Sequence, residues 1–393
     1  MKAEEHPMNA RADEPATIHR ARPEDVERIL DLLAHYDVPR GYFEPFYLKD
    51  PSYRPEHSWV AEEDGRFVAH LRVFDRRIRV SGTELRVAGV GNVITAPDQR
   101  GQGHAGQLLR AMLDAVPAEG FAYSLLRAYS AVLYERHGWA PIDQELVRAT
   151  LPPADTRSVA PFGDDDLPDV MHLYDETNAG RSGTTVRSPE YWHSQLEWLR
   201  EDRDGFLLSR TGDGGLAGYI RSRAGGDATE VLELGLKAGS DVGRALLSAA
   251  AARSGGRLRT FLPPSLRTLF RAHEGKITPE FGLMGRVLNL PALAAALEPV
   301  WLRRVRGSGS RGGSFRLATS AGNAELRVSA EEIRILHGTG EPAHTLDERA
   351  FAHLLFRGFD ENAEEHLGAG QDLSLLRTLF PAQDFVVWRS DAF

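Results

Sequence analysis

The chain has 393 residues, of which 42% are hydrophobic and 26% charged, proportions typical of a soluble globular protein with two or three domains. Its net charge of −9 argues against nucleic acid as a partner and mildly favours cationic small molecules. The absence of cysteine excludes disulfides and thiol nucleophiles, and the 14 histidines lack the close spacing of metal ligands. From this spacing we expect no metal site. No apolar run approaches the roughly 18 residues of a membrane span and no signal-peptide core is evident, so we expect a cytoplasmic protein.

Residues 1–15 are polar and show no periodicity, which predicts a disordered N-terminal tail. The first domain then begins with a short strand at Ile18 and a helix that starts at Pro23. The segment 38–53 that follows is aromatic and broken by proline. It could line a substrate pocket, or it could be a hydrophobic lid or a subunit contact, and the sequence favours neither. Alternating apolar residues predict antiparallel strands at 58–62, 66–74 and 85–88.

The centre of this domain is the stretch from Val90 to Val116. Its apolar beginning predicts a strand that ends before Pro97, and its end predicts a helix with one buried face. The turn between them contains Gly101, Gly103 and Gly106. Such a turn lets backbone N–H groups approach an anion, which the helix dipole also favours, and a neighbouring arginine adds a cation. The stretch therefore predicts a phosphate-binding loop.

One candidate ligand of this loop is a dinucleotide. The three glycines match the dinucleotide fingerprint, which also needs an acidic residue at the end of the next strand to hold the ribose. That strand, 121–127, contains neither Asp nor Glu, and the Lys-Ser/Thr pair of a P-loop is absent as well. We therefore reject the dinucleotide interpretation.

Two motifs instead resemble the GNAT N-acetyltransferases. The run Arg100-Gly-Gln-Gly103-His-Ala105 is similar to their Arg/Gln-x-x-Gly-x-Gly/Ala loop, which binds the pyrophosphate of acyl-CoA. The run Tyr134-Glu-Arg-His-Gly138-Trp139 resembles their aromatic-x-x-x-Gly-aromatic element beside the CoA thiol. A helix over 129–137 that ends at Gly138 is expected here. Together the motifs imply a mixed central sheet flanked by helices.

The order of elements partly repeats after a break at Leu151-Pro-Pro. A helix near Leu167 and a strand, turn and helix across 231–247 echo the first domain, without its Arg-x-x-Gly-x-Gly loop. This predicts a second, degenerate GNAT-like fold that does not bind CoA, the alternative being an unrelated αβ segment. A third unit is expected from about Met284, with a strand from Arg286, a helix from Pro291, a flexible turn at 306–313 and a final strand at 385–388.

This three-part order resembles the Eis (enhanced intracellular survival) family of GNAT acetyltransferases. The resemblance implies an α/β (α+β) fold class, with tandem GNAT folds followed by a sterol-carrier-like α+β domain. Its domains would span residues 16–150 (catalytic GNAT), 151–284 (degenerate GNAT-like) and 285–393 (sterol-carrier-protein-like). The resemblance further implies acetyl-CoA as co-substrate and a homo-oligomer, specifically a hexamer.

Single residues also take roles by this resemblance. Tyr134 matches the general acid of the family, and the α-carboxylate of Phe393 matches its general base. The chain departs from the pattern at Tyr129-Ser130, where the family has a Ser-Glu pair, and at Ala392, where an acidic residue would help to hold amines. The residues that would contact CoA are Val93, Ile94, Thr95, Arg100, Gly101, Gln102, Gly103, His104, Ala105, Gly106, Tyr129 and Ser130.

Three functions stay open at the level of sequence. The favoured one is an acetyl-CoA-dependent N-acetyltransferase acting on cationic amines, either aminoglycoside-like or lysine-like. The second is a non-catalytic acyl-CoA- or lipid-binding protein that uses its third domain as a carrier, and the third is a scaffold. Binding of acetyl-CoA without turnover would favour the second function, and no binding at all would favour the third.

Overall fold

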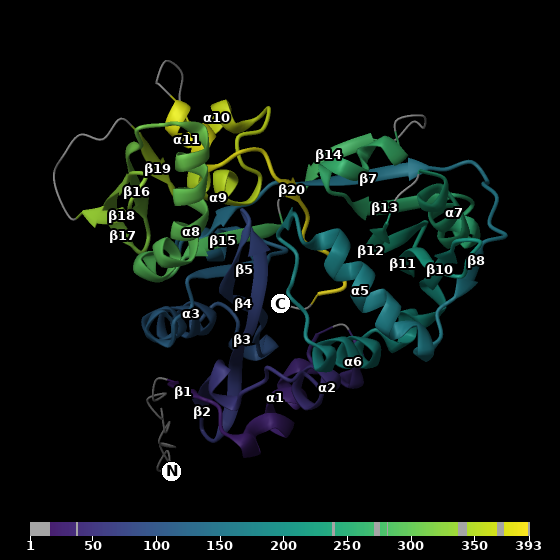
Figure 1. Ribbon diagram of the computed structural model, residues 1–393. Coiled ribbons are helices and arrows are strands. Elements are labelled where there is room, and N and C mark those ends of the chain that lie inside the picture. Colours follow the sequence, from purple (N-terminus) through teal and green to yellow (C-terminus); the bar gives the residue numbers. More distant parts are fainter. Residues whose placement is uncertain are drawn as a thin grey trace, which may run out of the picture.

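The computed structural model describes residues 16–36, 38–237, 240–270, 276–280, 282–336, 344–367 and 373–391. The disordered N-terminal segment expected at residues 1–15 and the expected general base Phe393 lie outside the described residues. The chain forms two seven-stranded sheets, a four-stranded sheet and a two-stranded pair, with helices packed against them (Figure 1). This confirms the mixed α/β class with two similar sheets. Within the described ranges, no helix is long and apolar enough to span a membrane.

The first sheet has the strand order β1-β2-β3-β4-β5-β15-β6. β4 and β5 run parallel, and all other neighbours are antiparallel. The pairing between β4 and β5 ends at Val90 and Leu126, although β4 continues to Thr95. We call the point where these two strands separate the first fork. The strands are β1 (Thr17–Arg20), β2 (Ser58–Glu63), β3 (Arg66–Val80), β4 (Thr83–Thr95), β5 (Tyr123–Arg127), β6 (Ala140–Pro141) and β15 (Leu283–Val287).

Helices cover both faces of this sheet. Neighbouring residues of a strand point to opposite faces, so Ala88 packs with α3 (His104–Ala115) whereas Val87 packs with α8 (Leu290–Ser308). α1 (Val26–Leu33) and α2 (Glu44–Leu48) lie on a separate apolar cluster. The helix expected over 129–137 is confined to α4 (Val132–Glu135), because Tyr129 and Ser130 are exposed and offer no buried face.

The second sheet repeats this arrangement in the order β14-β7-β13-β12-β11-β10-β8. β12 and β13 are its parallel pair, and their pairing ends at Val231 and Thr260, the second fork. The strands are β7 (Gln144–Thr150), β8 (Val159–Pro161), β10 (Phe206–Arg210), β11 (Leu216–Gly225), β12 (Ala228–Leu236), β13 (Arg257–Phe261) and β14 (Lys276–Glu280). The helices are α5 (Leu167–Asn178), α6 (Pro189–Trp198) and α7 (Ser240–Ala251).

The two sheets exchange one strand each. β7 follows β6 in the sequence but lies in the second sheet, between β13 and β14. β15 follows β14 but lies in the first sheet, between β5 and β6. The expectation that a strand from Arg286 opens the third unit is therefore wrong, because Arg286 pairs with Ser124 of the first sheet. Boundaries drawn along the sequence separate each exchanged strand from its sheet.

The third unit is a four-stranded sheet in the order β18-β17-β16-β19, and its core continues into one face of the first sheet. α8 begins after Asn289, whose side chain accepts from the Ala292 N–H, and remains helical through Ser308. The turn expected at 306–313 therefore starts later, at Gly309. The other elements are β16 (Gly313–Thr319), β17 (Gly322–Val328), β18 (Ile333–Leu336), β19 (Thr345–Asp347), α9 (Glu348–Phe356), α10 (Ala363–Leu367) and α11 (Ser374–Leu379).

The C-terminal segment leaves the third unit and returns to the other two. β20 (Asp384–Phe385) pairs in parallel with β9 (Arg181–Ser182). Residues 386–391, which we call the tail, then run between the first and second sheets (Figure 1). Only the first part of the final strand expected at 385–388 is therefore a strand, and the rest is extended chain buried between the two sheets.

Candidate active site

β4 carries a bulge where it passes the first fork. Asn92 has a φ of 51°, which is uncommon for a residue other than glycine, and the register with β3 shifts between His70 and Arg72. The Asn92 side-chain amide donates to the Tyr47 hydroxyl at 3.0 Å, and the Asn92 backbone carbonyl accepts from His70 Nδ1 at 2.9 Å. Burial lowers the pKa of His70 to about 4, so the ring is neutral at pH 7 and Nδ1 carries the donated proton. The bulge is thus held by two side chains.

The three residues after the bulge have different environments. The Val93 carbonyl accepts from the Tyr36 hydroxyl at 2.7 Å, and the Val93 side chain is half-buried. Ile94 is buried in the apolar cluster beneath α1. Thr95 is half-buried, and its carbonyl accepts from Arg100 Nε at 3.4 Å. Of the three expected CoA contacts on β4, Ile94 could therefore use only its backbone.

The glycine-rich turn follows and begins α3. Gly101 and Gly103 have φ values of 83° and 88°, which favour glycine, and a Cβ at either position would meet nothing within 4 Å. Gly103 is the N-cap of α3, and no side-chain hydrogen bond caps this helix end. The first N–H groups of a helix have no partner within it. The exposed loop, which also carries Arg100 and Gln102, therefore presents N–H groups that have no partner within the helix, and a positive helix end, to an open space.

The first turn of α3 approaches the turn after α4 at Gly106. A Cβ there would meet the His137 ring at 3.4 Å, which is an ordinary van der Waals contact. His137 Nδ1 donates to the Leu133 carbonyl at 2.8 Å, which fixes the ring on α4. His104 is buried, and neither of its ring nitrogens has a hydrogen-bond partner in the part of the chain that the structure describes. Ala105 between them is half-buried.

Tyr134 lies on α4 beside the first sheet. Its ring packs edge-on against Trp139 with centroids 6.2 Å apart, and Trp139 Nε1 donates to Ser124 Oγ on β5 at 3.2 Å. Burial raises the pKa of Tyr134, so the phenol stays protonated through neutral pH. Tyr129 and Tyr134 both interact electrostatically with Tyr36, whose pKa burial also raises. Tyr134 is therefore a protonated phenol packed beside the core of the first sheet.

The aromatic segment 38–53 lies between the first and second domains. The Phe46 ring stacks on Trp198 of α6 with centroids 5.0 Å apart, and Ser194 of α6 donates to the Lys49 carbonyl. Tyr47 from the same segment accepts the hydrogen bond from Asn92 at the bulge. The segment therefore contacts both the β4 bulge and the second domain.

Sequence reasoning missed a row of buried charges next to this region. Asp50 pairs with Arg72 at 2.8 Å and with Arg76 at 2.6 Å, and all three side chains are at most 2% exposed. Burial by itself would raise the pKa of Asp50, but the two arginines lower it to about 2. The available signal was two arginines on one face of an apolar strand. No group of carboxylates and histidines in the described ranges could hold a metal ion.

Comparison with known proteins supports these observations. Residues 17–142 match the family model described as an acetyltransferase (GNAT) domain. No curated protein matches the chain in sequence. Among solved structures, a probable N-acyltransferase from Enterococcus faecalis is similar with a TM-score of 0.71 and 15% identity, over 95% of this chain and 98% of that one.

Two further structures are similar over nearly their whole length. A GCN5-related N-acetyltransferase from Kribbella flavida has a TM-score of 0.69 and 19% identity, and covers 98% of this chain and 100% of its own. Eis1 from Mycobacterium abscessus has a TM-score of 0.66 and 17% identity, and covers 96% of this chain and 100% of its own. Residues 17–142 thus form a GNAT-type acetyltransferase domain, and the fold of the chain as a whole is similar to that of Eis1.

Proposed function

We propose that the chain is an N-acetyltransferase that transfers the acetyl group of acetyl-CoA to amines of cationic small molecules, aminoglycoside-like, or of lysine. The observation that carries the proposal is the glycine turn at the start of α3, beside the first fork. Free N–H groups, a positive helix end and the exposed Arg100 suit the charge of a pyrophosphate. The open space in front of Gly101 and Gly103 leaves room for it.

The remaining CoA contacts follow from this placement. With the pyrophosphate on residues 101–106, the pantetheine arm would lie along β4 at residues 93–95, where the strand has no partner from β5 among the described residues. Its amides would then bond the strand as a neighbouring strand does. Tyr129 and Ser130, which are exposed, lie just beyond β5 and would contact the arm from the other side.

Tyr134 is proposed as the general acid. As the amine nitrogen attacks the thioester carbonyl, the C–S bond breaks and the sulfur leaves as a thiolate, which leaves better when it is protonated. A buried phenol with a raised pKa still holds its proton at neutral pH and can supply it. Solvent then returns a proton to the phenolate.

Phe393 is proposed as the general base. A protonated amine is not a nucleophile, so a base must accept the proton that the nitrogen loses. An α-carboxylate, whose usual pKa is about 3.5, becomes a better base when it is desolvated, and a water can relay the proton. Support comes from the tail, which carries the chain to Asp391 between the two domains, with the carboxylate of Asp391 only 1% exposed.

The acceptor, the assembly and the third unit are proposals of the same kind. The net charge of −9 would attract cationic acceptors over long range. We further propose a cytoplasmic homo-oligomer, a hexamer by resemblance, with a sterol-carrier-like third domain and domain limits near residues 16, 150 and 284, apart from the two exchanged strands β7 and β15.

A panel of amines tests the function, with released CoA detected through its free thiol. We expect turnover with at least one aminoglycoside-like or lysine-like amine, and a lower kcat, by roughly tenfold or more, for Tyr134→Phe. Tyr123→Phe is the matched control because its buried hydroxyl on β5 has no hydrogen-bond partner among the described residues. Binding of acetyl-CoA without turnover on any amine would favour the carrier function, and no binding would favour a scaffold.

A further inference from the structure

The tail occupies the second fork. Beyond Val231 and Thr260 the strands β12 and β13 are no longer paired. There the Arg389 N–H donates to the Leu232 carbonyl of β12 at 3.0 Å. Arg389 also pairs with Glu230 of the same strand at 3.2 Å. The tail thus binds β12 next to the place where β13 leaves it.

Apolar side chains of the tail complete the core of the second domain. Val386 and Trp388 are each 1% exposed and belong to its hydrophobic cluster. Trp388 Nε1 donates to Asn178 Oδ1 of α5 at 3.1 Å, and the Val387 N–H donates to Gln144 Oε1 of β7 at 3.1 Å. Backbone bonds to a strand combined with buried side chains are the way a sheet binds an extended peptide.

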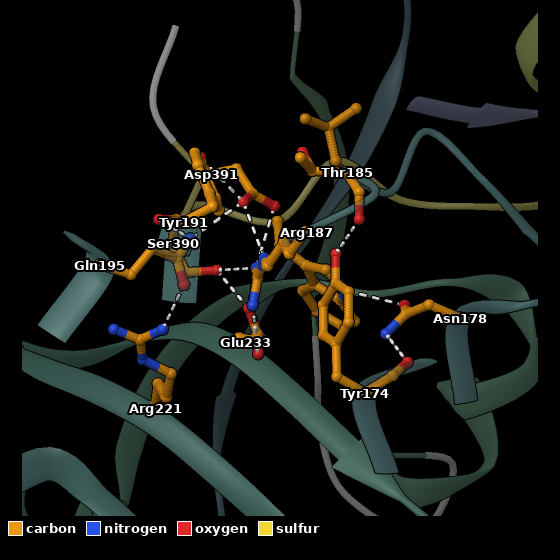
Figure 2. Close-up of polar contacts among 12 residues, drawn as sticks. Tyr174, Asn178, Thr185, Arg187, Tyr191, Gln195, Arg221, Glu233, Ser390 and Asp391 are labelled. Atoms are coloured by element: carbon orange, nitrogen blue, oxygen red, sulfur yellow. Dashed lines mark hydrogen bonds and ion pairs between the residues drawn. The ribbon is translucent and has the colours of Figure 1, made fainter. Parts of the chain in front are cut away.

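A buried arginine holds the last two described residues (Figure 2). Arg187 donates to both carboxylate oxygens of Asp391, at 2.9 and 3.0 Å, and it also pairs with Glu233 of β12. Ser390 bridges the same groups, since its hydroxyl accepts from Arg187 and donates to Glu233. Burial by itself would raise the pKa of Glu233, but the attraction of Arg187 brings it below its usual value. Glu233 is therefore ionised, and the one guanidinium of Arg187 binds both its carboxylate and that of Asp391.

Two residues of α6 complete the binding of Asp391. Gln195 Nε2 donates to Asp391 Oδ1 and to the Ser390 carbonyl, both at 2.9 Å, and the Tyr191 hydroxyl donates to Asp391 Oδ1 at 3.2 Å. These side chains are buried, so the bonds to the Asp391 charge are strong.

The loop that carries Arg187 is itself fixed to the first sheet. The Arg79 N–H donates to the Thr184 carbonyl and the Val186 N–H donates to the Arg77 carbonyl, both at 2.8 Å. The guanidinium of Arg76 lies 4.7 Å from the centre of the Tyr191 ring. The residues that bind Asp391 are thus held in place by the first domain.

We propose that the second fork is a peptide-binding site, specific for an extended segment that contains Trp-Arg-Ser-Asp, and that the tail fills it in cis. Arg187 is its main positioning residue, because it links the Asp391 carboxylate to Glu233 of β12. β12 is the strand of the second sheet that corresponds to β4. This gives the second GNAT-like domain a role, that of holding the tail in a fixed place beside the first domain. The proposal does not depend on acetyl transfer.

A trans-binding experiment tests the site directly. A chain that stops after Gln383 would be titrated with a fluorescein-labelled, amidated peptide of residues 384–391. We expect saturable binding of one peptide per chain, and binding weaker by roughly tenfold or more for the same peptide with Asp391→Ala, which loses charged hydrogen bonds. Binding of the two peptides with equal affinity, or no binding to a truncated chain that is folded, would overturn the proposal.

Hydrogen exchange in the full chain decides the matter if the truncated chain does not fold. Asp391→Ala leaves Arg187 paired with Glu233, so it removes only the bonds to the tail. We expect exchange of residues 386–391 to rise by roughly tenfold or more, with α3 and β11 unchanged. The control Tyr219→Phe removes a hydroxyl that bonds Glu233 and should leave the tail as in the wild type. Unchanged exchange of the tail, or an equal rise throughout the second domain, would overturn the proposal.

Discussion

The two forks are the same feature of the fold used in two ways. At each fork a pair of parallel strands stops pairing, which leaves backbone groups on the longer strand without a partner from its neighbour. At the first fork a bulge, a glycine turn and a helix start surround this strand end. At the second fork the chain's own tail bonds the strand and buries Trp388 in the core. Unpaired backbone at a fork thus requires a partner, which is either a ligand or the protein itself.

The helix starts near the two forks also differ, in the charge of their first turns. α3 begins at Gly103 with no acidic residue in its first turn, and Arg100 precedes it. The first turn of α7 carries Asp241, whose side chain is 93% exposed. A carboxylate at this position would repel a pyrophosphate. Asp241 also pairs with Arg244 of the same helix, and the tail already bonds β12, so we expect the second domain not to bind CoA, although its sheet has the same order of strands.

The largest expected effect concerns the end of the tail. If the second fork positions the tail so that the Phe393 carboxylate acts as base at the first fork, then deleting Phe393 or adding a C-terminal tag should lower kcat by about a hundredfold to ten-thousandfold. Acetyl-CoA affinity should stay unchanged, because its proposed contacts lie elsewhere. Steady-state kinetics and calorimetry measure the two quantities.

The variant Phe393→Leu is the control for this experiment. It keeps the α-carboxylate and should retain most of the activity. Full activity of a C-terminally tagged enzyme would show that the Phe393 carboxylate is not the base. The tail held at the second fork would then have no role in catalysis at the first fork.

A smaller effect is expected at the glycine turn. Gly103→Asp would place a negative charge against the pyrophosphate and a side chain at a φ of 88°, and Arg100→Ala would remove a cation. We expect either change to weaken acetyl-CoA binding by roughly tenfold or more in calorimetry. Asp241→Ala at the second fork is the matched control and should not change the affinity. Wild-type affinity in both first-fork variants would show that the turn does not hold the phosphates.

The sequence predicted the features that are local. The glycine turn and the helix after it are contiguous, so their spacing indicated them, and the element from Tyr134 to Trp139 was indicated by its resemblance to the GNAT family. The strand exchange could not be predicted, because β7 pairs with residues more than 100 positions away and nothing in its alternation selects a sheet. Arg187, Glu233 and Asp391 are likewise far apart in sequence and meet only in the fold. The order of elements indicated two similar sheets but not which strands the two sheets exchange.

The last expected effect is on stability rather than on binding or catalysis, and it concerns the exchanged strand β15. Glu348 of the third unit accepts from the Val287 N–H at 2.6 Å and from the Ser320 N–H at 3.2 Å, and burial raises its pKa to about 7. Because this pKa lies above its unfolded value of 4.5, the folded state holds the proton more tightly. The resulting stability is complete below about pH 4.5 and is lost as the pH rises through 7.

Glu348→Gln cannot ionise and therefore serves as the reference for this effect. Relative to the variant, the wild type should lose stability on the order of 3 kcal/mol between pH 5 and pH 8. Thermal unfolding at several pH values should show the variant gaining a few degrees in Tm over the wild type as the pH rises. A constant difference in Tm across this range would contradict the assignment.

The central claim is that the first fork binds acetyl-CoA and the second fork binds the tail. Calorimetric titration of the full chain with acetyl-CoA tests it most directly. We predict saturation at one acetyl-CoA per chain, and the loss of that single binding event in Gly103→Asp. Saturation at two per chain, or one site that persists with unchanged affinity in Gly103→Asp, would contradict the account.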